Sequence, residues 1–227
     1  MASCDITRIE RIAPGGVLPQ VFEAERDEPR FASSQVMLAD LVFERGRTYS
    51  INAVSGAGKT SLCSFLYGVR TDYIGSITFD GRDIRSFGIP QWCALRCRNL
   101  AYLPQELVLF PTLTAMENVL LKNRLTDFHT EAEIRDLFAR LEIDNRADVP
   151  AGRLSAGQRQ RVAIIRALCQ PFDFILLDEP VSHLDAVNNG LCAALVAETA
   201  SALGAGVIFT SVGNPLHIDT PLIPLTL

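Results

Sequence analysis

The sequence has no excess of positive charge. Of its 227 residues, 21 are Lys or Arg and 26 are Asp or Glu, which gives a formal net charge of −5. A protein with this balance has no overall basic field with which to hold a phosphodiester backbone. We therefore expect no nucleic acid as its main partner.

Long apolar runs are also missing. The stretch VAIIRALC, which follows Arg161, is eight residues long, far short of the roughly 18 to 20 apolar residues that a membrane-spanning helix needs. The opening residues, MASCDITRIERIAP, place Asp5, Arg8 and Glu10 where a signal peptide would need an unbroken apolar segment. We expect a cytoplasmic protein that reaches the inner face of the cell membrane only through a partner.

The cysteines lack the spacing of a disulfide scaffold or a zinc ribbon. They are scattered through apolar stretches, as buried thiols in a reducing compartment are. Cys93 and Cys97 could share one helical face, but no second Cys or His pair lies nearby in the sequence, so we expect no metal site there. The six cysteines are Cys4, Cys63, Cys93, Cys97, Cys169 and Cys192.

Residues 53–60, AVSGAGKT, fit the phosphate-loop pattern of Gly, four free positions and Gly-Lys-Ser/Thr at all but the first position, which is Ala53. The preceding RTYSINAV has the character of a strand, and KTSLCSFLYGV after it has apolar residues at helical spacing. Strand, loop and helix are the context that the pattern requires. Backbone N–H groups at a helix N-terminus bind anions, so we predict a phosphate site at Ser55, Gly56, Ala57, Gly58, Lys59, Thr60 and Ser61.

Individual side chains of this loop suggest further roles. Lys59 adds a positive charge for the outer phosphates of a nucleotide, and Thr60 offers a hydroxyl to Mg²⁺. The methyl group of Ala53 is harmless if its φ is negative and strained if its φ is positive.

Apolar residues make up 48% of the chain, enough for a substantial core in one large or two small domains. FDFILLDEP contains a nearly continuous apolar run, typical of a parallel strand buried on both faces. Ligands gather at the carboxyl ends of such strands, so Asp178 and Glu179 are expected beside the phosphate loop. Taken alone, they could equally be an acidic pair that caps a turn before Pro180.

Two further strands are predicted, at residues 206–211 and 98–104, so the fold class is α/β. Between about residues 106 and 170 the pattern becomes helical. Three sequences there have capping-box form: Thr114 with Glu117, Thr130 with Glu133, and Ser155 with Gln158. We predict a helical insert in a parallel-sheet core.

The segment LSAGQRQRVAIIRAL is, by itself, an amphipathic helix with a good N-cap. It resembles the LSGGQ signature of ATP-binding cassette (ABC) ATPases, with Ala156 in place of the first Gly. FILLDEP follows where that family has its Walker B carboxylates, and SHLD at 182–185 resembles its D-loop. Gln105 and the following ELVLFPTLTAMENVLL resemble its Q-loop. The resemblance extends from about Gly46 to near the end of the chain.

This resemblance implies a P-loop NTPase (RecA-like) core with a mostly parallel sheet. An antiparallel β part near the N-terminus and a helical subdomain would complete the cassette. The nucleotide-binding core would comprise residues 1–105 and 171–227, and the signature-bearing helical subdomain residues 106–170.

The resemblance also implies that two cassettes pair head to tail and hold ATP between them. The phosphate loop of one copy would face Ser155, Ala156, Gly157 and Gln158 of the other. Asp178, largely through water, and Thr60 would hold Mg²⁺, while Gln105 would sense the metal and the γ-phosphate. Glu179 would act as the general base for the attacking water.

One departure from the family concerns the switch His that contacts the γ-phosphate, because this chain has Ser211 there. Without another group in its place, hydrolysis is expected to be slower by roughly 10²-fold. His183 and His217 are candidate substitutes, and an ordered water beside Ser211 is another. For the aromatic residue that stacks on adenine, we favour Phe22 over Phe31.

A single cassette with only residues 61–154 between phosphate loop and signature lacks the long insertions of chromosome and DNA-repair members. The leading function is therefore the ATP-hydrolysing subunit of a membrane transporter, working with an integral-membrane permease. GRDIRS and LFPTLTAMENV are most similar to the lipoprotein-release, macrolide-export and cell-division group. The alternative is an ATP-dependent dimerising switch with little hydrolysis, whereas a kinase would have no use for the signature.

The segment after Gln105 is the expected contact with the permease. Its apolar side chains either anchor a short partner helix or belong to the core of the helical insert, and both interpretations stay open. These residues are Leu107, Val108, Leu109, Phe110 and Leu113.

Overall fold

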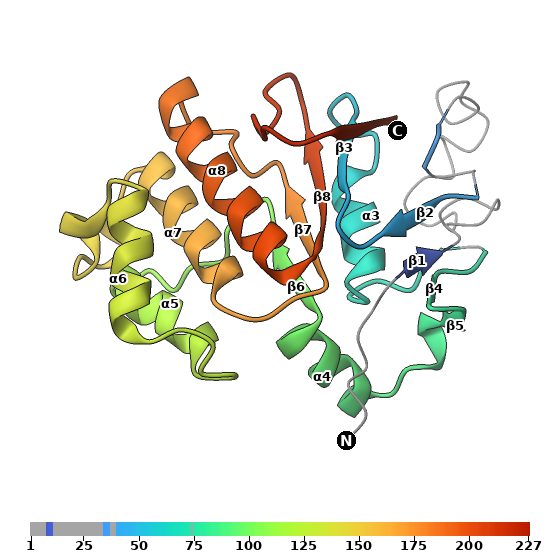
Figure 1. Cartoon of the computed structure of the whole chain (residues 1–227), viewed down its shortest axis with the longest axis horizontal. Helices are drawn as coiled ribbons and strands as arrows, with labels where there is room; N and C mark the ends of the chain where they lie inside the picture. Colours follow the sequence, from blue (N-terminus) through green and yellow to red (C-terminus); the bar gives the residue numbers. More distant parts are fainter. Residues whose placement is uncertain (1–7, 11–33, 37–39, 74) are drawn as a thin grey trace.

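The computed structural model describes residues 8–10, 34–36, 40–73 and 75–227. Two sheets and six longer helices make up this part of the chain (Figure 1). The strands are β1 (Arg8–Glu10), β2 (Val42–Glu44), β3 (Thr48–Asn52), β4 (Thr78–Phe79), β5 (Arg82–Asp83), β6 (Leu100–Leu103), β7 (Phe174–Asp178), β8 (Gly206–Ser211) and β9 (Leu222–Thr226). The α-helices are α3 (Lys59–Leu66), α4 (Ile89–Arg98), α5 (Ala115–Asn123), α6 (Glu131–Arg140), α7 (Ala156–Leu168) and α8 (Ala186–Leu203). Short 3₁₀ turns occupy Ile84–Ser86, Asp144–Arg146 and Ala151–Arg153.

The larger sheet has the strand order β6-β7-β8-β3-β9, and each neighbouring pair is parallel. Asp178 at the end of β7 lies opposite Thr210 of β8, and Ser211 lies opposite Asn52 at the end of β3. The carboxyl ends of three strands therefore meet at one edge, where the sequence predicts the ligand site.

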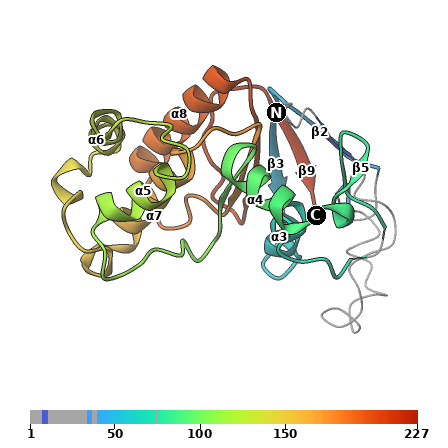
Figure 2. The same ribbon diagram turned by 90° about the horizontal axis from the view of Figure 1, so that it is seen from below.

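Alternate residues of the central strands pack on opposite faces of this sheet, as the two-residue period of a strand requires. Ile175 and Phe209 belong to the core cluster that contains residues of α7 and α8. Phe174 and Ile208 belong to the cluster that contains Leu62 and other residues of α3. Figures 1 and 2 show α8 and α3 on the two sides of the sheet. The buried strands therefore read as continuous apolar runs.

The smaller sheet has the order β2-β1-β4-β5 with antiparallel pairing throughout. Its core includes Ile9 and Phe79, which join the same cluster as α3. The predicted fold class is confirmed: the chain has a mostly parallel sheet flanked by helices and an antiparallel part formed by early residues. No helix in the described ranges combines the length and apolarity needed to cross a bilayer.

Helices α5, α6 and α7 each begin where the sequence predicts a cap. The side chains of Thr114, Thr130 and Ser155 accept a hydrogen bond from the backbone N–H three residues on. The side-chain oxygen of the Glu or Gln at that position accepts a bond from the backbone N–H of the capping residue. All three predicted capping boxes are confirmed. Each box reduces fraying at the start of its helix, because it gives a hydrogen-bond partner to N–H groups that have none within the helix.

The cysteine prediction is only partly right. Cys63, Cys169 and Cys192 are buried, as expected, but Cys93 is exposed and Cys97 is only half-buried. Cys4 lies outside the described residues. Cys93 lies on α4, where Leu95 is the one fully buried residue, so most of this helix faces away from the core.

The loop between β6 and α5 is held to the helix by Asn118, which has no exposed surface. Its Oδ1 accepts a hydrogen bond from the N–H of Phe110 at 2.8 Å. Its Nδ2 donates to the carbonyl oxygens of Phe110, Leu113 and Thr114. One buried amide thus fixes the segment that follows Gln105.

We expect Asn118→Leu to lower the free energy of unfolding by about 2–3 kcal/mol, because a similar volume is kept while several backbone groups lose their partner. Urea unfolding followed by circular dichroism measures the loss. Asn145→Leu, at an exposed position, is the matched control and should change stability by less than about 0.5 kcal/mol. Equal stability of the two variants would contradict this role for Asn118.

Candidate functional site

The loop between β3 and α3 turns sharply at two glycines. Gly56 has φ +81° and Gly58 has φ +95°, values that L-residues with a side chain adopt only at a cost. Ala53 is not among the residues with positive φ, so its methyl group adds no strain. The non-glycine residue at the first position of the motif is therefore compatible with the loop.

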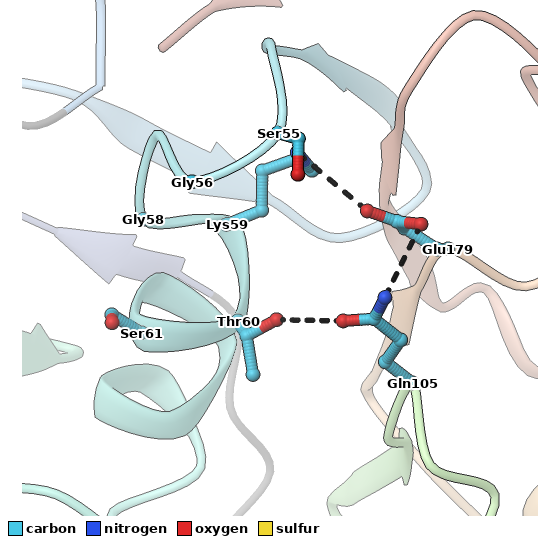
Figure 3. A pocket seen from close by; sticks show the side chains of 8 residues that line it. All are labelled: Ser55, Gly56, Gly58, Lys59, Thr60, Ser61, Gln105 and Glu179. Atoms are coloured by element: carbon cyan, nitrogen blue, oxygen red, sulfur yellow. Dashed lines mark hydrogen bonds and ion pairs between the residues drawn. The ribbon is translucent and has the colours of Figure 1, made fainter.

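Lys59, the first residue of α3, is held under this loop with only 5% of its surface exposed. Its Nζ donates to the carbonyl oxygens of Ala53 at 3.3 Å and Val54 at 2.9 Å. It also lies 3.6 Å from Oε1 of Glu179. The phosphate loop and the end of β7 thus meet through one ion pair (Figure 3).

A chain of side chains connects three elements across the site. The hydroxyl of Thr60 donates to Oε1 of Gln105 at 3.3 Å, and Nε2 of Gln105 donates to Oε2 of Glu179 at 3.5 Å. Figure 3 shows both contacts facing the loop. Together these groups line a pocket of about 290 Å³, formed by Ser55, Gly56, Gly58, Lys59, Thr60, Ser61, Gln105 and Glu179.

Asp178, directly before Glu179, is 1% exposed. Its Oδ1 accepts a hydrogen bond from the hydroxyl of Thr210 at 2.7 Å. Its Oδ2 is buried and receives no hydrogen bond from the described residues. Burial raises the pKa of the nearby Cys63 thiol well above its ordinary value, and the charge of Asp178 adds to the rise. The thiol therefore stays neutral and contributes no negative charge.

These oxygen donors fit Mg²⁺. The ion favours hard oxygen ligands and is usually held by one or two protein groups together with water and substrate phosphates. Thr60 and Gln105 present oxygens in the pocket. Asp178 does not line the pocket, but its Oδ2 is a buried acceptor to which no described residue donates. Among the described residues, no cluster of three or more His, Cys, Asp or Glu could form a self-contained metal cage.

The backbone of Glu179 has φ +49°, which is uncommon for a residue with a side chain. Its N–H donates to Oγ1 of Thr210 at 3.1 Å, and its carbonyl oxygen accepts from Nε2 of the buried Gln160 at 3.1 Å. Sequence reasoning missed Thr210 and Gln160. Thr210 gave a weak signal, as a polar residue in the mostly apolar stretch GVIFTS. Gln160 gave none, because its neighbours Arg159 and Arg161 are polar as well.

The residues of the signature lie apart from this pocket. Ser155 and Gln158 satisfy one another in the capping box of α7, and none of residues 155–158 lines the pocket of the same chain. A Cβ on Gly157 would stand 3.1 Å from the carbonyl oxygen of His183. The signature helix thus packs closely on the segment after β7, and its predicted contact with a phosphate requires a second copy.

Ser211 is 2% exposed, and its hydroxyl donates to Oδ1 of Asn52 at 2.6 Å. Neither residue lines the pocket. His183 and His217 are exposed and do not line it either, and Nδ1 of His183 lies 3.0 Å from Oγ of Ser182. Phe22 and Phe31, the candidates for adenine stacking, lie outside the described residues.

Comparison with known proteins gives a family match over residues 37–182, to the model described as "ABC transporter". Similar curated proteins include the lipoprotein-releasing system ATP-binding protein LolD of Francisella tularensis subsp. tularensis, 30% identical over 176 residues, which are 76% of each chain. LolD of Porphyromonas gingivalis is 32% identical over 173 residues, 74% of this chain and 79% of that protein.

A solved structure described as the dimeric structure of MJ0796, a bacterial ABC transporter cassette, superposes with a TM-score of 0.72. It is 25% identical in sequence, and the match covers 82% of this chain and 84% of the other. The resemblance predicted from the motifs, including that to the lipoprotein-release group, is confirmed by these matches.

Proposed function

The chain belongs to the ABC transporter family, and we propose that it hydrolyses Mg²⁺-bound ATP in a head-to-tail homodimer to drive an integral-membrane permease. One observation carries this proposal: the phosphate loop, Gln105 from the end of β6 and Glu179 from the end of β7 line one pocket. Binding, sensing and hydrolysis of a nucleotide require these groups to act on the same phosphate. We also retain the division into a nucleotide-binding core (1–105 and 171–227) and a helical subdomain (106–170) as part of the proposal.

The phosphate loop would bind the β- and γ-phosphates through the N–H groups at the start of α3, where the helix dipole favours negative charge. Gly56 and Gly58 permit the tight path of this loop. Lys59 would neutralise charge that develops on the outer phosphates. Its ammonium group lies beside the loop carbonyls and Glu179, and the residue lines the pocket.

Thr60 and Gln105 would hold Mg²⁺ directly, and Asp178 would hold it largely through water. When bound, the ion would neutralise charge on the phosphate oxygens. Gln105 would link this region to the neighbouring loop, because it lies two residues after the end of β6 and precedes the segment that Asn118 fixes.

Glu179 would orient the attacking water and accept its proton. A carboxylate suits this task because it is a hydrogen-bond acceptor at neutral pH. Its side chain is held from two sides, by Lys59 at 3.6 Å and by Gln105 at 3.5 Å. These contacts restrict the carboxylate to the side of the pocket that faces the loop (Figure 3).

A second copy would complete the site with Ser155, Ala156, Gly157 and Gln158. Ser155 is the N-cap of α7, and the other three residues form its first turn. This proposal rests on their position outside the pocket of their own chain and on the dimeric cassette that the chain resembles. A single chain is therefore expected to hydrolyse ATP poorly.

The permease is proposed to bind a groove of about 360 Å³ beside the loop after β6. Val108 (58% exposed) and Phe110 (54%) border it together with Leu121 and Leu125. Arg166 donates to the carbonyl oxygens of Leu107 and Val108 and so supports this turn. The groove suits a short helix that carries apolar side chains.

The segment after Gln105 divides between the two interpretations: some of its residues belong to the core, and others are exposed where a partner helix is proposed to bind. Leu107 is buried and Leu109 packs against the core of the helical part, whereas Val108 and Phe110 are exposed at the groove. Bound in this way, the chain would be peripheral on the cytoplasmic face of the membrane. The curated relatives are named for lipoprotein release, and we propose a permease of that kind.

The alternative function, an ATP-dependent switch with little hydrolysis, is favoured only by Ser211. Its hydroxyl is occupied by Asn52 and lies outside the pocket, so it is poorly placed to replace an imidazole. The relatives and the matching cassette favour the transporter subunit. Slow turnover within that function remains part of the proposal.

We expect Glu179→Gln to reduce ATP turnover by at least roughly 10²-fold, because an amide cannot accept the proton of the attacking water. ATP affinity should stay within a few-fold of the wild type. Phosphate release and equilibrium nucleotide binding measure the two effects. Glu106→Gln, at an exposed position outside the pocket, is the control. If wild-type turnover is barely measurable and Glu179→Gln does not lower it, the switch is the better description.

Ser211→His should raise turnover, by up to roughly 100-fold, because an imidazole at the end of β8 restores a donor to the γ-phosphate. Ser211→Phe supplies a ring without nitrogen and should not raise it. Steady-state ATPase assays on both variants decide the matter. A wild type that already hydrolyses ATP at a rate unchanged by the His variant would show that Ser211 is no impediment.

Phe110→Asp should detach the permease and leave ATP binding intact, because it places a charge in an apolar groove and Phe110 does not line the phosphate pocket. The readout is the amount of integral-membrane partner that co-purifies from detergent-solubilised membranes. Ile89→Asp, at an 82% exposed apolar residue outside the groove, is the matched control. An intact complex with Phe110→Asp would place the docking surface elsewhere.

A further inference from the structure

Thr210 occupies a completely buried position in β8, in register with Asp178 of β7. Most of its neighbours in this strand are apolar, and valine would fill the same volume. The hydroxyl group is therefore the informative part of the side chain. It takes part in two hydrogen bonds, one with the carboxylate of Asp178 and one with the backbone N–H of Glu179.

The first bond runs from Oγ1 of Thr210 to Oδ1 of Asp178 at 2.7 Å. The two oxygens of this carboxylate therefore differ: Oδ1 has a hydrogen-bond donor within the protein, and Oδ2 is a buried acceptor with none among the described residues. An unsatisfied buried carboxylate oxygen is costly unless a cation or a donor meets it. The bond to Thr210 thus fixes the rotation of this carboxylate, so that Oδ2 is the oxygen left to meet a cation or a water bound to it.

The second bond runs from the N–H of Glu179 to Oγ1 of Thr210 at 3.1 Å. Glu179 needs such support because its φ of +49° is unfavourable for a residue with a side chain. Gln160 holds the carbonyl oxygen of the same residue from the other side. The backbone of Glu179 is therefore hydrogen-bonded on one side to β8 and on the other to the signature helix α7.

We propose that Thr210 is a positioning residue for ATP hydrolysis: its hydroxyl orients the Asp178 carboxylate toward the magnesium ion and supports the strained backbone of Glu179. Because Thr210 is completely buried and does not line the pocket, it would act only through these two residues. This inference rests on the proposed function. When a residue that hydrogen-bonds to a metal ligand and orients it is removed, metal affinity or activity typically falls 10- to 100-fold.

The experiment compares Thr210→Val, which removes the hydroxyl at constant volume, with Thr210→Ser, which keeps it. Thr199→Val is the matched control, because that hydroxyl donates to the carbonyl oxygen of Leu195 in α8, away from the site. Mn²⁺ binding in the presence of ATP is followed by electron paramagnetic resonance. Nucleotide binding in EDTA and thermal unfolding are measured on the same samples.

We expect Thr210→Val to weaken Mn²⁺ binding roughly 10- to 100-fold, with ATP binding in EDTA within twofold of the wild type. Thr210→Ser should recover most of the loss even if its missing methyl group lowers the melting temperature. Thr199→Val should leave Mn²⁺ binding unchanged.

Wild-type Mn²⁺ affinity in Thr210→Val would overturn the inference. Equal losses in the Val and Ser variants would also overturn it, since they would show that the methyl packing matters and the hydroxyl does not. A wild type that binds no Mn²⁺ with ATP would instead overturn the proposed function and the inference together. The wild-type titration thus distinguishes the two failures.

Discussion

The parallel register of β7, β8 and β3 is the constraint on which the rest of the site depends. Because Asp178 lies opposite Thr210, and Ser211 opposite Asn52, three strand ends and the phosphate loop meet at one edge of the sheet. The two-face packing of these strands between α3 and the α7–α8 layer prevents a one-residue slip, which would exchange the two buried faces. Within that frame, the Lys59–Glu179 contact joins the binding loop to the proposed general base.

Much of this arrangement could be predicted from the sequence because its signals are local or periodic. The run FILLD is uniformly apolar because both faces of β7 are covered, and the structure places a strand there. The capping boxes at α5, α6 and α7 depend on residues three positions apart, so they are legible without tertiary information. The loop at residues 53–58 was predictable for the same reason, and the φ values of its glycines account for their identity.

The remaining features depend on contacts between distant residues. Thr210 meets Asp178 across 32 positions and Ser211 meets Asn52 across 159, and no spacing rule reveals such pairs. The exposure of Cys93 depends on how little of α4 the fold covers. The apolar segment after Gln105 divides between core and groove because Asn118 and Arg166 fix its turns. Buried hydroxyl and amide groups, each with its partners elsewhere in the chain, are what sequence reasoning missed.

The central claim is that two copies of the chain share each nucleotide, with the phosphate loop of one facing the start of α7 in the other. Sedimentation equilibrium of the Glu179→Gln protein, with Mg²⁺ and labelled ATP, tests it most directly. The account predicts that saturating ATP converts a species of one chain into a species of two chains carrying bound nucleotide. Stoichiometric ATP binding to a species that keeps the mass of a single chain at every protein concentration would contradict it.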